Sequence, residues 1–142
     1  MKKYCWITGV LIVFLTVLCV VLWQQKGAEH TKMENLCQSS AAMALENFIN
    51  YKTSDNESDY VSGVAEFRSF MTAYLFLSDN NANAEYIWCN IVYGEMTLHP
   101  EKVQNNIQRL IDALKYLSKD YDNPNGFNLI SVYSNELTHG ND

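Results

Sequence analysis

Three side chains able to bind a metal ion recur on one side of a predicted helix near the amino terminus. His30, Glu34 and Cys37 stand at positions i, i+4 and i+7, so an imidazole, a carboxylate and a thiol share one helix face. Structural zinc sites use four such ligands, and the sequence offers no fourth donor at a suitable spacing. We therefore expect a solvated helix face here, with no metal and no other cofactor.

A second group of side chains that could take part in catalysis is acidic. Asp55, Glu57 and Asp59 alternate with serine and asparagine in a polar break. General acid–base catalysis would need a desolvated carboxyl group, and these neighbours are not apolar. Acids at a helix start instead complement its exposed N–H groups. No phosphate-binding glycine loop and no nucleophile motif occurs in the chain, so the sequence predicts a protein that is not an enzyme.

Cys37 and Cys89 are the only cysteines after residue 26. An even number of cysteines in an oxidising compartment indicates a disulfide, which we expect between these two residues. The loop that the bond closes, about 52 residues, would be worth roughly 4 kcal/mol in the chain-entropy model. The alternative is two separate thiols, each buried on a helix face.

The elements that would position these groups are all helical, because apolar residues recur at helical spacing and never alternate for long. Thr31 with Glu34 and Ser54 with Glu57 fit capping boxes, while Pro100 suits a first helical position. Predicted helices cover about residues 31–51, 54–77, 82–96, 100–121 and 124–137. Short polar connections favour antiparallel neighbours, so we expect a compact four- to five-helix antiparallel bundle.

The clearest pattern lies in the fourth predicted helix, where apolar residues step alternately by four and three positions. This stripe predicts a core helix, and its members are Val103, Ile107, Leu110, Leu114, Leu117 and Tyr121. In the last predicted helix the residues expected to point inward are Phe127, Ile130 and Leu137.

The amino-terminal region has a different composition. Residues 4–23 form an uncharged run of twenty residues, the length of a membrane-spanning helix. Lys2 and Lys3 precede it, which favours an amino terminus inside the cell. The sequence thus predicts a cytoplasmic tip at residues 1–3 and a transmembrane signal-anchor helix over residues 4–24. An extracytoplasmic helical domain would follow over residues 27–142, held at the inner membrane by a single span. A cleaved signal peptide is the alternative.

The segment from Gly27 onward contains seven basic and sixteen acidic residues, a balance of −9. A nucleic-acid-binding surface needs basic side chains, so this class is disfavoured. An acidic surface instead speeds association with a basic protein partner.

Six short motifs carry a resemblance to a known family. Among them are a cysteine-bearing first helix, a glycine-serine element, a proline-acid helix start and an asparagine-proline turn. The motifs lie at residues 33–37, 62–67, 99–103, 110–112, 116–124 and 127–133. Together they resemble the Tai family, the periplasmic immunity proteins that neutralise type VI secretion amidase effectors. In that family the last helix usually offers a cysteine, and Ser131 occupies the nearest position here.

The resemblance implies an immunity protein that binds a secreted peptidoglycan amidase and occludes its active site. The residues expected to contact the partner lie in the break at 53–63 and are Asp55, Glu57, Asp59, Ser62 and Gly63. The acids would supply rim charge, and Gly63 would permit close backbone approach. The alternative is a non-catalytic accessory or adaptor subunit of a membrane or envelope complex. Whether the protein forms a homodimer stays open.

Overall fold

The computed structural model describes residues 2–78 and 82–140, with side chains described for Ile12 and from Phe14 onward. Within these residues the chain forms six α-helices and no strand, so the predicted all-α class is confirmed. The chain divides into two compact units, Met1–Lys32 and Met33–Asp142. Each is described by itself, as unit 1 and unit 2.

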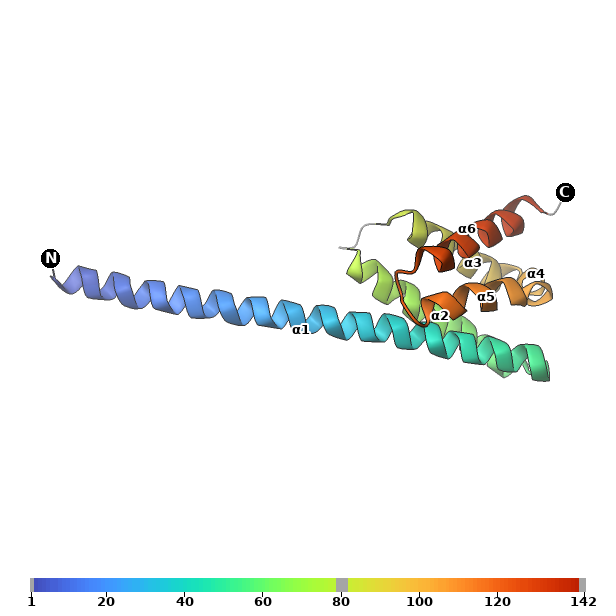
Figure 1. Cartoon of the computed structure of the whole chain (residues 1–142), viewed down its shortest axis with the longest axis horizontal. Coiled ribbons are helices and arrows are strands. Elements are labelled where there is room, and N and C mark those ends of the chain that lie inside the picture. The colour runs from blue at the N-terminus through green and yellow to red at the C-terminus, as the bar shows by residue number, and fades with distance from the viewer. Residues whose placement is uncertain (1, 79–81, 141–142) are drawn as a thin grey trace. The chain divides into compact units, whose positions relative to one another are not determined.

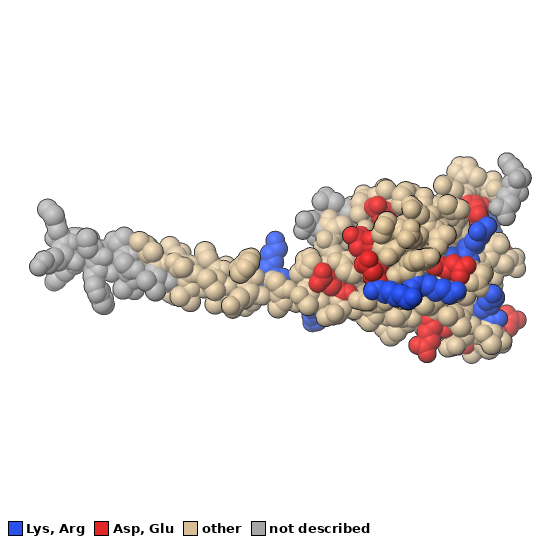
Figure 2. Space-filling view, in the orientation of Figure 1, with Lys and Arg blue, Asp and Glu red and all other residues tan. Residues whose placement is uncertain are grey.

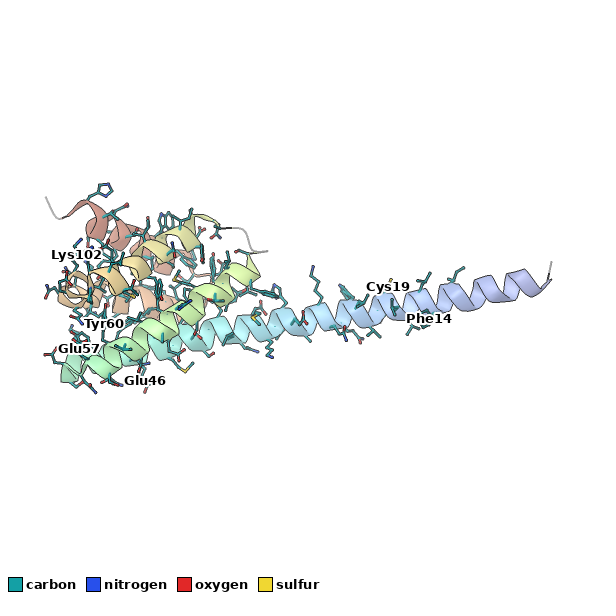
Figure 3. All side chains as sticks on the ribbon, turned by 180° about the vertical axis from the view of Figure 1, so that it is seen from behind. Phe14, Cys19, Glu46, Glu57, Tyr60 and Lys102 are labelled. Atoms are coloured by element: carbon teal, nitrogen blue, oxygen red, sulfur yellow. The ribbon has the colours of Figure 1, made fainter. Side chains whose placement is uncertain are left out.

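Unit 1 consists of the first part of α1 (Lys2–Ser54). Between Ile12 and Trp23 the large apolar side chains that the structure describes are exposed, and Figure 3 shows Phe14 and Cys19 projecting from the helix. The hydroxyl of Thr16 donates to the carbonyl of Ile12 at 2.8 Å, so this polar group is satisfied within its own helix.

No helix in the described part of the chain is both long and apolar enough to span a membrane. The predicted transmembrane anchor at residues 4–24, and with it the single-pass inner-membrane location, is therefore contradicted. The side chains of residues 4–11 and 13 lie outside the described ones.

The helix predicted to start at Thr31 in fact continues an existing one. Residues 24–31 hold no proline, and Gly27 alone does not interrupt α1. Thr31 lies inside the helix and cannot act as its amino-terminal cap.

Unit 2 consists of the second part of α1 and five further helical segments. They are α2 (Glu57–Leu77), α3 (Ala84–Leu98), α4 (Pro100–Asn105), α5 (Ile107–Leu117) and α6 (Pro124–His139). After a tight turn α2 runs back along α1, α3 packs on α2, and α5 and α3 both pack on α6 (Figure 1).

After α1, one helix cap and one helix break differ from the prediction, and the two helix starts at proline agree with it. At α2 the cap is Asn56, not Ser54, because the hydroxyl of Ser54 donates back to the carbonyl of Asn50 at 2.8 Å. The predicted helix 100–121 divides at Asn106, whose φ of −122° departs from helical values. Pro100 begins α4, and Pro124 begins α6 as predicted.

One apolar core fills unit 2. Leu110, Leu114 and Leu117 of the predicted stripe are fully buried in α5, which confirms their core role. Phe127 of α6 packs against two aromatic rings of α2. Its ring centre lies 4.9 Å from that of Tyr74, with the rings tilted, and 6.4 Å from that of Phe70, on which it stacks. The remaining predicted inward residues of α6, Ile130 and Leu137, are also buried.

Candidate functional site: an acidic corner and an apolar groove

The turn between α1 and α2 brings the predicted partner-binding acids to one corner of unit 2. Asp55 adopts a left-handed backbone with φ of 55°, and its N–H donates to the carbonyl of Tyr51 at 2.7 Å. The side chain of Asn56 then accepts from the N–H of Ser58 at 3.1 Å, which caps α2. The chain thus reverses direction within two residues. We call Asp55, Glu57 and Asp59 the acidic corner.

One of these carboxylates is held in place by a neutral donor. Glu57 accepts from Nε2 of Gln104 with both oxygens, at 3.1 and 3.2 Å. Asp59 lies 3.3 Å from the hydroxyl oxygen of Ser54, whose single proton is shared with the nearer carbonyl of Asn50. Because Gln104 carries no charge, the corner keeps its negative charge while Glu57 is fixed.

Beneath the corner lies a pair of tyrosine rings, Tyr51 and Tyr60, with ring centres 5.2 Å apart. Figure 3 shows Glu57 and Tyr60 on α2 near the turn. The hydroxyl of Tyr60 donates to the carbonyl of Met96 at 3.2 Å. Burial raises the pKa of Tyr60, and the neighbouring Tyr51, Glu57 and Glu101 raise it further. These rings anchor the corner to the core.

Ser62 and Gly63 lie apart from the corner, one turn into α2. The hydroxyl of Ser62 is exposed and donates to the carbonyl of Ser58 at 2.8 Å. Gly63 is buried, and a Cβ added to it would come within 2.6 Å of Cε1 of Phe48. The close approach that the glycine allows is therefore between α1 and α2 of the same chain.

Cys37 and Cys89 are both buried and both free thiols, so the predicted disulfide is not formed in this structure. The thiol of Cys37 points to the carbonyl of Phe70, 3.7 Å away. Burial, aided by the charge of Asp122, raises the pKa of Cys37 to about 12, and burial raises that of Cys89 as well. Neither thiol is activated as a nucleophile.

The His30, Glu34 and Cys37 face does not assemble a metal site. Cys37 is turned into the core, and Glu34 accepts from the hydroxyl of Tyr121 at 3.1 Å. Among the residues that the structure describes, no three His, Cys, Asp or Glu side chains are grouped so that they could hold a metal ion.

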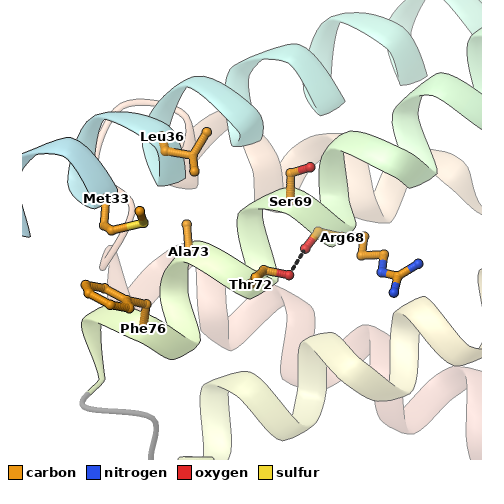
Figure 4. A pocket seen from close by; sticks show the side chains of 7 residues that line it. All are labelled: Met33, Leu36, Arg68, Ser69, Thr72, Ala73 and Phe76. Carbon is orange, nitrogen blue, oxygen red and sulfur yellow. Dashed lines mark hydrogen bonds between the residues drawn. The ribbon is translucent and has the colours of Figure 1, made fainter. Parts of the chain in front are cut away.

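The sequence did not predict an open groove between α1 and α2, with a volume of about 430 Å³ (Figure 4). Its lining is mostly apolar and consists of Met33, Leu36, Arg68, Ser69, Thr72, Ala73 and Phe76. We call it the α1–α2 groove. In α1 the apolar residues Met33, Leu36, Cys37 and Ala41 recur at helical spacing, which indicates a buried face, yet Leu36 is 42% exposed. The exposure of Leu36 depends on where α2 packs, so the sequence of α1 alone could not indicate it.

On the other side of α2 lies a second hollow of about 330 Å³, formed with α3. Tyr86, Asn90 and Tyr93 give this hollow a polar lining, and Arg68 and Thr72 line both hollows. Arg68 therefore stands between an apolar and a polar concavity.

Acidic and basic side chains are interspersed on the face of unit 2 that Figure 2 shows. Three described basic residues of unit 2 are paired with carboxylates. Lys102 pairs with Glu95 at 3.3 Å, Arg109 with Glu136 at 3.3 Å and Lys115 with Asp112 at 2.9 Å. Arg68 has no such ion pair within the described residues and instead lies over the ring of Tyr93, 6.0 Å from its centre.

Comparison with protein families, with curated proteins and with solved structures finds no match to this chain.

Proposed function

We propose that unit 2 is a non-catalytic inhibitory protein that binds a cell-wall amidase effector and covers its active site, as an immunity protein does. The observation that carries the proposal is the acidic corner, where three exposed or half-exposed carboxylates stand on a turn fixed to the core. The specific partner class comes from the resemblance of the motifs at residues 33–37 and 99–124.

The rigidity of the corner supports this mode of action. When an inhibitor binds in a cleft, each of its side chains that becomes ordered on binding lowers the affinity through lost conformational entropy. Here Gln104 already holds Glu57 before a partner arrives. The Tyr51–Tyr60 pair fixes the turn beneath them. The cost of ordering the contact surface is thus small.

Charge supports a basic partner surface. The segment from Gly27 onward has a net charge of −9, which raises the rate of encounter with a positively charged cleft. Carboxylates at the rim of an interface act mainly on this rate and on its salt dependence. Occlusion needs no catalytic group in the inhibitor.

The test measures whether the protein inhibits peptidoglycan hydrolysis by a purified cell-wall amidase effector. The variant Asp55→Asn/Glu57→Gln/Asp59→Asn should weaken inhibition at least about tenfold, mainly through slower association. A matched variant, Glu46→Gln/Glu66→Gln/Glu85→Gln, removes three acids elsewhere and should inhibit as the wild type does. Equal inhibition by the two variants would contradict the role of the corner. No inhibition by the wild type would contradict the function.

A further inference from the structure

We propose that the hollow between α2 and α3 binds a small molecule that carries one carboxylate beside an amide group, of the size of an N-acylated amino acid. The hollow has a volume of about 330 Å³, and we call it the α2–α3 hollow. Its lining consists of Arg68, Met71, Thr72, Tyr86, Asn90 and Tyr93. None of these residues belongs to the acidic corner, so the proposal does not depend on the inhibitory function proposed above.

Two helices supply polar side chains to the hollow from opposite sides. On α3, Tyr86, Asn90 and Tyr93 recur at intervals of four and three residues, so they share one face of that helix. On α2, Arg68 and Thr72 stand four residues apart and also share a face. The lining is therefore set by the packing of two regular helices.

Arg68 provides the charge that a ligand would meet. The chain contains two arginines, and Arg109 pairs with Glu136 at 3.3 Å, whereas Arg68 has no ion pair within the described residues. Its guanidinium lies over the ring of Tyr93, 6.0 Å from the ring centre, and Figure 4 shows it directed away from the apolar side chains of the α1–α2 groove. A planar guanidinium that stacks on a ring keeps the N–H groups at its edge available. These groups can bind a carboxylate through two parallel hydrogen bonds.

Other polar groups of the hollow also lack partners in the protein. Among the described residues, no hydrogen bond involves the hydroxyls of Tyr86 and Tyr93 or the side-chain amide of Asn90. Thr72 differs, because its hydroxyl donates to the carbonyl of Arg68 at 2.9 Å. A side-chain amide both donates and accepts, which matches the C=O and N–H of a peptide group. Asn90 therefore favours a ligand with an amide near its carboxylate.

The charge balance favours a monoanion over a phosphate. A carboxylate carries one charge, which one guanidinium neutralises, whereas a phosphate monoester carries about −1.5 to −2 at pH 7. The segment from Gly27 onward has a net charge of −9, so it repels anions, and the repulsion grows with the charge of the ligand. A single carboxylate at Arg68 is thus the preferred anionic group.

The volume indicates a small ligand. Ligand pockets commonly measure about 300–1,000 Å³, and the α2–α3 hollow, at about 330 Å³, lies at the lower end of this range. An amino acid with a short acyl group has a suitable size. Because so small a molecule makes few contacts, we expect a dissociation constant on the order of 1 mM.

The test is an NMR titration of the isotope-labelled full chain with N-acetylglycine and, separately, with its neutral counterpart N-acetylglycinamide. The two arginines provide one Nε–H signal in the hollow and one internal control. N-acetylglycine should shift the signal of Arg68 to saturation and leave that of Arg109 unchanged. N-acetylglycinamide should bind at least about tenfold more weakly, because it has no charge to pair with the guanidinium.

Two substitutions test the two halves of the recognition, with the backbone amide of Tyr93 as the signal. Arg68→Lys keeps the charge but loses the paired hydrogen bonds, so it should weaken binding of N-acetylglycine at least about fivefold. Asn90→Ala should weaken binding of N-acetylglycine about threefold and leave binding of acetate, which has no amide, unchanged. Arg109→Lys is the matched control and should bind as the wild type does.

Four outcomes would overturn the proposal. They are equal binding of the acid and its amide, equal shifts at Arg68 and Arg109, unchanged binding in Arg68→Lys, and no saturation up to roughly 100 mM, a hundred times the expected constant. Inorganic phosphate that binds more tightly than N-acetylglycine would also contradict it, because the hollow would then select a more highly charged anion.

Discussion

Phe48 and Gly63 meet at the crossing of α1 and α2, where the missing side chain of the glycine makes room for the aromatic ring. A Cβ placed on Gly63 would lie 2.6, 2.8 and 2.9 Å from three ring carbons of Phe48. These distances are below any normal carbon–carbon contact, and Phe48 is fully buried, so the ring has little room to move. The separation of the first two helices of unit 2 depends on this pair.

Gly63→Leu should therefore destabilise the protein by about 1–3 kcal/mol, the usual cost of overpacking a core. Urea unfolding followed by circular dichroism would measure the change. Gly94→Ala is the control, because nothing lies within 4 Å of a Cβ at that helical position and alanine should stabilise it by roughly 0.5–1 kcal/mol. A Gly63→Leu variant as stable as the wild type would show that Phe48 can yield.

Asp55 combines a left-handed backbone with an exposed charge, and substitutions can separate the two. Asp55→Val should cost about 1–2 kcal/mol in unfolding free energy, since a β-branched residue is strained at a φ of 55°. Asp55→Gly and Asp55→Asn should stay within about 0.5 kcal/mol, because both residues tolerate this conformation. Equal stability of all three variants would contradict the strained turn.

The buried thiols predict a loss of stability at high pH. Below the ordinary thiol pKa of 9.0, Cys37 is protonated whether the chain is folded or unfolded. As the pH rises toward about 12, the unfolded thiol ionises first, so stability falls over this window. With a reductant present, the wild type should lose more stability between about pH 8 and pH 10 than Cys37→Ala/Cys89→Ala does.

Thiol labelling separates the free thiols of the structure from the disulfide that the sequence indicates. In the folded protein, Cys37 and Cys89 should react slowly, because both are buried, whereas the exposed Cys19 should react quickly. After unfolding without a reductant, labelling of both Cys37 and Cys89 would confirm the free thiols. Failure of both to react would indicate the bridge.

Unit 2 should fold without most of unit 1. Every buried apolar side chain among the described residues lies at Cys37 or later in the chain. A fragment of residues 27–142 should therefore keep the unfolding free energy of the full chain within about 0.5 kcal/mol. Urea unfolding of the two proteins makes the comparison. A fragment that binds hydrophobic dyes and unfolds without cooperativity would contradict an independent core.

Part of this architecture follows from the sequence by local rules. The alternating steps of four and three from Val103 to Leu117 predicted a buried stripe, and those side chains are buried. Asn123 and Pro124 predicted the start of α6, where a side-chain cap and a residue without an N–H both suit the first turn. Such signals depend on residues within one or two helical turns, so they do not depend on which other helices pack against the segment.

The functional surfaces depended on neighbours distant in sequence. Ser54 was predicted to cap α2, whereas Asn56 caps it in the structure, where Tyr51 packs on Tyr60 beneath the turn. Gly63, expected to face a partner, is covered by Phe48, and Leu36, on an apolar stripe, is left open. Local apolar spacing was enough to assign residues to one helix face. Which of those faces are covered depends on the packing of whole helices, because two helices approach only as closely as the side chains of both allow.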